Sequence, residues 1–132
     1  MRQKFFAILM IFVLMPAFAQ TPDKQPTPQE LAAKEAERLE RLLDLEPWQV
    51  FYVDSTLQHD YAALQAEMTE MQKAKVENYD LYMGVRDKWA EQIDDTYKRY
   101  FNEDQWNKYL KSGAARAKKA RDKRKAKAEK GR

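Results

Sequence analysis

Apolar residues recur along most of this chain at steps of three and four, the spacing of a helix face rather than of a strand. The first start signal is Thr27-Pro28-Gln29-Glu30, in which Thr27 and Glu30 match a capping box and Pro28 suits the first helical position. It predicts a helix that runs to about Asp44. The apolar side of this helix is expected to comprise Leu31, Ala36, Leu39, Leu42 and Leu43.

A second helix is predicted from Pro47 to about Val76, because Pro47 disfavours helical geometry at the preceding residue. Its stripe is Val50, Phe51, Val53, Leu57, Tyr61, Leu64, Met68 and Met71. A third helix is predicted from about Tyr79 to Phe101, with Asn78 as a suitable N-cap. No proline separates these two helices, so the pattern leaves open whether they are distinct or form one bent rod.

A fourth helix is predicted to begin after Asn102, with Gln105 at its N3 position. After Leu110 the chain contains alanine and basic residues but no apolar stripe, so residues 111–132 should be a solvated, fraying helix or disordered. The pattern therefore predicts an all-α protein of about four helices in an extended, curved hairpin arrangement. We expect a flexible leader at residues 20–27, a helical domain at 28–110 and a basic tail at 111–132.

The N-terminus has the features of a cleaved secretory signal peptide at residues 1–19. Arg2 and Lys4 precede an apolar run, which ends in Ala17-Phe18-Ala19, a small-x-small cleavage signal. The alternative is an uncleaved anchor, but the run is shorter than the roughly 20 apolar residues that span a bilayer. We expect a mature chain that begins at Gln20 and works in the periplasm.

Charge is divided unevenly along the chain. Residues 111–132 contain eleven basic and two acidic residues, whereas residues 20–110 contain eleven basic and nineteen acidic ones. Such a tail attracts anionic surfaces, or it is a solvated appendage without a specific partner. Export makes nucleic acid an unexpected partner.

The residue types offer little for catalysis or metal binding. The chain has no cysteine, and its one histidine, His59, has no second ligand three or four residues away. We therefore expect a protein that is not an enzyme and that uses no cofactor and no metal.

Twelve aromatic residues follow the signal segment, and all lie between Trp48 and Tyr109. They form a core, or part of the stripe is exposed as a binding surface. A chain of this length with long helices cannot easily bury both stripes alone, so we expect a homodimer.

Two of the helix starts share a five-residue pattern, Leu45-Glu46-Pro47-Trp48-Gln49 and Phe101-Asn102-Glu103-Asp104-Gln105. Spaced 56 positions apart, they resemble the paired LTxxQ motifs of the Spy/CpxP-like periplasmic family. The apolar residues Leu45 and Phe101 and the glutamines Gln49 and Gln105 match. Glu46 and Asn102 replace the threonines, so the chain looks like a diverged member.

That resemblance implies an all-α homodimer shaped as a thin curved cradle, acting as an ATP-independent chaperone or as an envelope-stress accessory protein. Its clients would be unfolded or aggregation-prone exported proteins. The surface residues we expect to hold them are Trp48, Phe51, Tyr52, Trp89, Tyr97 and Trp106. The alternative function is an envelope structural or tethering protein whose cationic tail, residues 111–132, binds anionic envelope surfaces.

Overall fold

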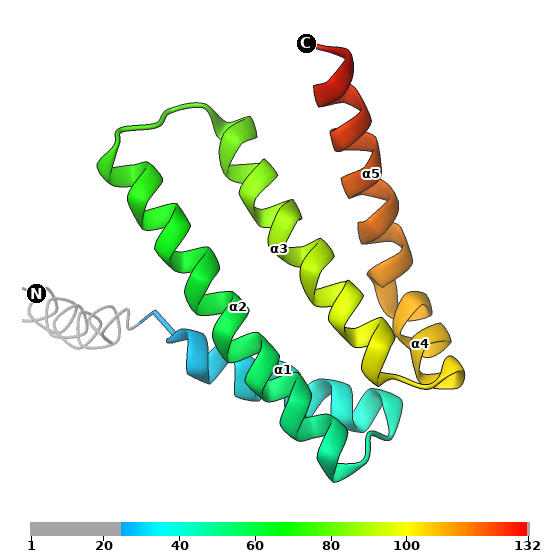
Figure 1. Ribbon diagram of the computed structural model, residues 1–132. Helices are drawn as coiled ribbons and strands as arrows, with labels where there is room; N and C mark the ends of the chain where they lie inside the picture. Colours follow the sequence, from blue (N-terminus) through cyan, green and yellow to red (C-terminus); the bar gives the residue numbers. More distant parts are fainter. Residues whose placement is uncertain (1–24, 132) are drawn as a thin grey trace, which may run out of the picture.

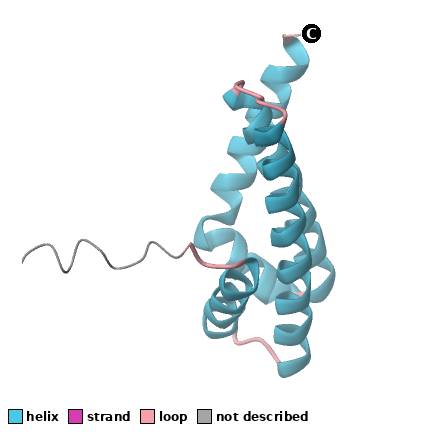
Figure 2. Cartoon of the chain, turned by 90° about the vertical axis from the view of Figure 1, so that its left-hand side faces the viewer, coloured by secondary structure: helices cyan, strands magenta, loops and turns pink. Residues whose placement is uncertain are grey.

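The computed structural model describes residues 25–131, and this part of the chain is helical without any strand (Figures 1 and 2). The expected signal peptide and most of the expected leader lie outside the described residues. The all-α prediction is confirmed. Within the described part, no helix is both long enough and apolar enough to cross a membrane.

Helix α1 spans Pro28–Leu43 and begins as predicted. The Glu30 amide donates to the Thr27 hydroxyl, and the Thr27 amide donates to the Glu30 carboxylate, which closes the capping box. The helix ends at Asp44 in the left-handed conformation, with φ of 52°.

Helices α2, Pro47–Lys73, and α3, Tyr79–Tyr100, form an antiparallel hairpin (Figure 1). They are two helices rather than one bent rod. The connection includes Lys75 with φ of 58°, a left-handed residue that reverses the chain. Because this turn uses residues 74–78, α2 ends earlier than the predicted Val76. Asn78 caps α3 as expected, since its side chain accepts a hydrogen bond from the Asp80 amide.

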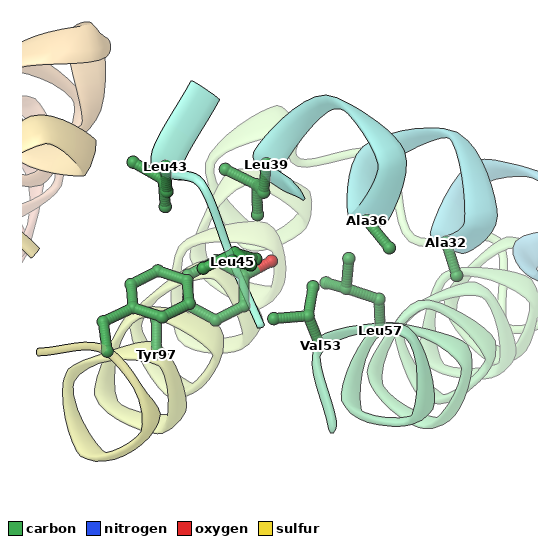
Figure 3. Close-up of a cluster of buried hydrophobic side chains, with 9 residues drawn as sticks. Ala32, Ala36, Leu39, Leu43, Leu45, Val53, Leu57 and Tyr97 are labelled. Carbon is green, nitrogen blue, oxygen red and sulfur yellow. The ribbon is translucent and has the colours of Figure 1, made fainter. Parts of the chain in front are cut away.

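Helix α1 lies across the base of this hairpin, packed mainly on α2 (Figure 1). Ala32 and Ala36 are buried on its inner face, where small side chains let α1 and α2 approach closely. Leucines and Tyr97 complete the core shown in Figure 3. Its buried members are Ala32, Ala36, Leu39, Leu43, Leu45, Val53, Leu57, Tyr97 and Phe101.

Two leucines expected on the apolar side of α1 lie outside this core. Leu31 and Leu42 are exposed, whereas Ala32 and Leu43 are buried beside Ala36 and Leu39. Ala36, Leu39 and Leu43 are buried as predicted. The buried face is therefore the predicted one turned by less than one position, with Ala32 included in place of Leu31 and Leu42.

Helix α4, Glu103–Tyr109, passes through a π-helical segment at Leu110–Ala114 into α5, Ala115–Lys130. Gly113 has φ of 122°, a conformation that side chains strongly disfavour, and marks a kink there. Of the two states expected for the basic segment, the described part adopts the helix. This helix runs back along α3 (Figure 1) instead of standing free, a packing that the sequence did not predict.

Candidate functional site

The glutamines of the two five-residue motifs meet in the interior. Gln49 Nε2 donates to Gln105 Oε1 over 2.7 Å, and Gln105 Nε2 donates to Gln49 Oε1 over 3.0 Å. Both side chains are buried although they are 56 positions apart in sequence. The start of α2 and the start of α4 are thereby joined by a reciprocal amide pair.

Each glutamine also caps its own helix. The Glu46 amide donates to Gln49 Oε1, and the Asn102 amide donates to Gln105 Oε1. A backbone N–H only donates, so it requires the oxygen of each side-chain amide to face it. This fixes the orientation of both amides and leaves each Nε2 directed at the other glutamine. Gln49 Nε2 has a second acceptor, the Tyr100 carbonyl at 2.9 Å.

Both helix starts have the arrangement of a capping box, but only the Asn102 side chain makes a side-chain cap hydrogen bond. Asn102 Oδ1 accepts from the Gln105 amide at 2.8 Å, which completes a capping box at α4. The Glu46 carboxylate accepts from the Trp48 indole at 2.6 Å. Gln49 thus reaches back to the α2 cap, while Glu46 uses its carboxylate to orient an exposed tryptophan.

Exposed aromatic rings border this junction. Trp48 and Phe51 are 49% and 66% exposed, and Tyr52 is also exposed. The Tyr52 ring stacks on Tyr100 of α3 with centroids 4.8 Å apart, while Trp48 and Phe51 each meet Tyr52 edge to face. We call these four residues the aromatic patch. A depression of about 510 Å³ beside it is lined by Asp44, Glu46, Trp48, Gln49, Tyr100, Phe101, Asn102 and Gln105.

The other aromatic residues expected on the binding surface are placed differently. Tyr97 is only 2% exposed and packs in the core against Phe101 and Tyr109, so its assignment to a surface is wrong. Trp89 is half-buried, and its indole donates to Glu67 of α2. Trp106 is half-buried against Tyr109. Spacing at steps of three and four places these aromatic residues on the apolar side of each helix. It does not tell which of them lie at the buried edge of that side and which lie at its exposed edge.

A second exposed apolar site, which the sequence analysis did not single out, lies at the start of α3, next to the hairpin turn. Tyr79 and Leu81 are exposed there, far along α3 from the aromatic patch (Figure 1). In the sequence, Tyr82, Val85 and Trp89 follow one another at steps of three and four and define the apolar side of α3, and Tyr79 and Leu81 lie at its margin.

The basic segment is held to α3 by a buried polar cluster. Asp94 of α3 accepts from the Tyr109 hydroxyl and from the Arg121 guanidinium, both at 2.5 Å. Asp94 and Arg121 are nearly buried, so each charge needs the other. Burial, followed by the bond to Asp94, raises the pKa of Tyr109, and burial also raises the pKa of Tyr97.

One helical turn further along α5, Arg124 forms a two-point ion pair with Asp87 of α3, at 2.8 and 2.9 Å. This pair is partly exposed and is worth less than the buried one. Between the two helices lies a cleft of about 720 Å³. Its α3 wall includes Asp80, Asp87 and Glu91, and its α5 wall includes Arg124 and Lys127.

His59 is exposed, and its Nδ1 lies 2.8 Å from Oδ1 of the buried Asp60. The same oxygen accepts from Gln92 of α3 at 3.4 Å. Among residues 25–131, no group of three histidine or carboxylate side chains is gathered in a way that suits a metal ion.

Known protein-family models, curated protein sequences and solved structures were compared with this chain, and none of the three comparisons found a match.

Proposed function

We propose that this protein is an exported, non-enzymatic binding protein that holds partly unfolded proteins on its aromatic patch. The observation that carries the proposal is the exposure of Trp48, Phe51 and Tyr52 beside the buried Gln49–Gln105 pair. Large apolar rings left in water on one face are typical of a surface that binds protein. The resemblance to Spy/CpxP-like proteins implies the same class of function and the periplasm as its location.

The patch has the physical properties that such binding needs. Tryptophan and tyrosine offer large contact areas with few rotatable bonds, so they lose little entropy on contact with varied clients. Stacking on Tyr100 and the indole bond to Glu46 hold two of the rings in place. The acidic excess of residues 20–110 adds long-range attraction for basic segments of clients.

A homodimer is part of this proposal. Two copies that cover the exposed leucines of α1, Leu31 and Leu42, would bury apolar surface while leaving the patch open. Light scattering of the chain without residues 1–19 should then give about twice the monomer mass.

The test is suppression of aggregation of a chemically unfolded model client. We compare the parent chain with Trp48→Ser/Phe51→Ser, which removes two rings from the patch, and with Tyr79→Ser/Leu81→Ser, which removes two exposed apolar residues from the start of α3. All four residues are exposed, so all variants should fold. The patch variant should lose suppression and the second variant should keep it.

Equal activity of all three proteins would contradict the proposal. Loss of dimer mass together with unchanged suppression in the patch variant would also contradict it, because the patch would then be a contact between subunits. Point variants are preferable to a chain that ends at Leu110. That truncation removes Arg121 and leaves Asp94 buried without its cation.

A further inference from the structure

Helix α5 has two faces that differ in how their charges are used. The inner face directs Arg121 and Arg124 at the carboxylates of α3. Both arginines are therefore committed to the protein's own body. The whole basic segment is consequently not one uniform cationic tail.

The outer face carries a separate set of basic residues, Arg116, Lys119, Lys123 and Lys130, which we call the cationic stripe. They follow one another at steps of three, four and seven, so they lie on one side of the helix over about 21 Å. All four are exposed, and none lines the cleft against α3. Among the described residues, none of the four forms an ion pair.

Acidic residues are few on α5 and lie beside this stripe rather than within it. Helix α5 contains two carboxylates, Asp122 and Glu129, and their positions in the helical repeat place both on a neighbouring flank. Asp122 lies 3.7 Å from Lys118, which is outside the stripe. None of the four stripe charges is therefore held in an ion pair, although Asp122 lies three positions from Lys119 and borders the stripe, and the docked helix presents the four together.

We propose that the cationic stripe is a docking surface for a membrane that carries anionic lipid head groups. Charge complementarity supports this occupant, because several aligned cations on a helix add their attractions to a negatively charged surface. The side of α5 that bears the stripe has no large apolar residue, so contact is peripheral and does not involve insertion. The predicted export of the chain favours a lipid surface over nucleic acid.

The ion pairs between α5 and α3 determine which side of α5 faces away from the rest of the protein. A disordered basic tail also binds anionic membranes, but it spreads its charges in all directions. Here Arg121 and Arg124 fix the rotation of α5, so that the four stripe residues share one side of the molecule. The membrane then contacts α5, while α3 with its carboxylates stays behind the helix. This proposal does not depend on client binding by the aromatic patch.

Co-sedimentation with vesicles tests the proposal. The chain without residues 1–19 is mixed with vesicles of phosphatidylcholine alone or with about 30% phosphatidylglycerol, an anionic lipid that gives the surface a negative potential. Binding is measured at low and at high salt. We expect binding only to the anionic vesicles and a steep loss as salt rises. Each basic residue near such a surface adds roughly five-fold to partitioning. Replacing all four stripe residues with glutamine should therefore weaken binding by about 100-fold or more.

The matched control replaces four exposed basic residues of the body, Lys34, Arg86, Lys98 and Lys108, with glutamine. It removes the same charge and should bind anionic vesicles almost as the parent does. Circular dichroism of both variants should match the parent, since none of the eight side chains is buried. Equal weakening by both sets would show that net charge and not the stripe is responsible. That outcome, or binding to phosphatidylcholine alone, would overturn the proposal.

A competition experiment with nucleic acid tests the other class of polyanion that the stripe could bind. Duplex DNA at the same phosphate concentration should compete weakly with the anionic vesicles. Tighter binding of the stripe to DNA than to vesicles would overturn the assignment to a lipid surface.

Discussion

Gln49 and Gln105 exchange two hydrogen bonds across the interior, each as donor and as acceptor, while each also accepts the backbone N–H that begins its own helix. The caps of α2 and α4 are therefore parts of a single tertiary contact. A change at either glutamine affects both helix starts at once.

We expect Gln49→Ala or Gln105→Ala to lower the free energy of unfolding by about 2–3 kcal/mol each, because buried donors and acceptors lose their partners. The double variant should cost less than the sum by at least about 1 kcal/mol, since the second change removes a group already left without its partner. Urea unfolding of the four proteins measures this coupling. Gln65→Ala, at an exposed position within α2, is the control and should have little effect. Strict additivity would contradict the reciprocal pair.

The two ion pairs of α5 should differ in strength. Arg121→Ala leaves the nearly buried Asp94 without its cation, so we expect a loss of about 3 kcal/mol and faster amide hydrogen exchange along α5. Arg124→Ala removes an arginine in an exposed pair and should leave the unfolding midpoint almost unchanged. If the two variants behave alike, the burial of the Asp94–Arg121 contact does not determine how α5 is held.

The buried tyrosines make alkaline stability testable. Burial raises the pKa of Tyr97 and of Tyr109 above that of an unfolded tyrosine, which is about 10. The folded protein keeps both hydroxyls protonated where the unfolded chain releases its protons. Stability is therefore fully present below about pH 10 and falls as the pH rises beyond it. Unfolding midpoints between pH 8 and 11.5 should decrease, and Tyr97→Phe/Tyr109→Phe should flatten this decrease.

The caps of α2 and α4 lead to opposite expectations for two substitutions. Asn102→Ala should cost about 1 kcal/mol, because the Gln105 amide loses its acceptor. Glu46→Thr should be neutral or stabilising, since threonine is the better N-cap and the indole bond that it removes is exposed. Thermal unfolding of both variants measures the difference. A clear loss with Glu46→Thr would show that the carboxylate contributes more than its bond to Trp48.

The N-terminal segment gives a further prediction. Protein isolated from the envelope fraction of producing cells should begin at Gln20, because Ala17-Phe18-Ala19 matches a cleavage signal. Intact mass and N-terminal sequencing report this directly. Retention of residues 1–19 in a membrane pellet would instead indicate an uncleaved anchor.

The sequence alone determined the helices, since their starts depend on neighbours within one turn. Thr27 with Glu30 and Asn102 with Gln105 form the expected capping boxes because a cap requires only local hydrogen bonds. The all-α class follows from the same local signals and from the repeat of apolar positions. The spacing does not supply the exact rotation of each helix face, so it does not distinguish the buried Tyr97 from the exposed Leu31 and Leu42 on the apolar sides of their helices.

Only the tertiary structure decided which distant residues meet. Nothing in either motif specifies that Gln49 and Gln105 face each other, because the pairing requires α2 to be folded back through α3. The docking of α5 is of the same kind. From the sequence alone, an arginine among lysines and alanines is expected to be solvated. Only the tertiary structure brings Asp94 and Asp87 of α3 close enough to pair with Arg121 and Arg124. Local hydrogen bonds are encoded within a few residues, whereas burial and ion pairing depend on the path of the whole chain.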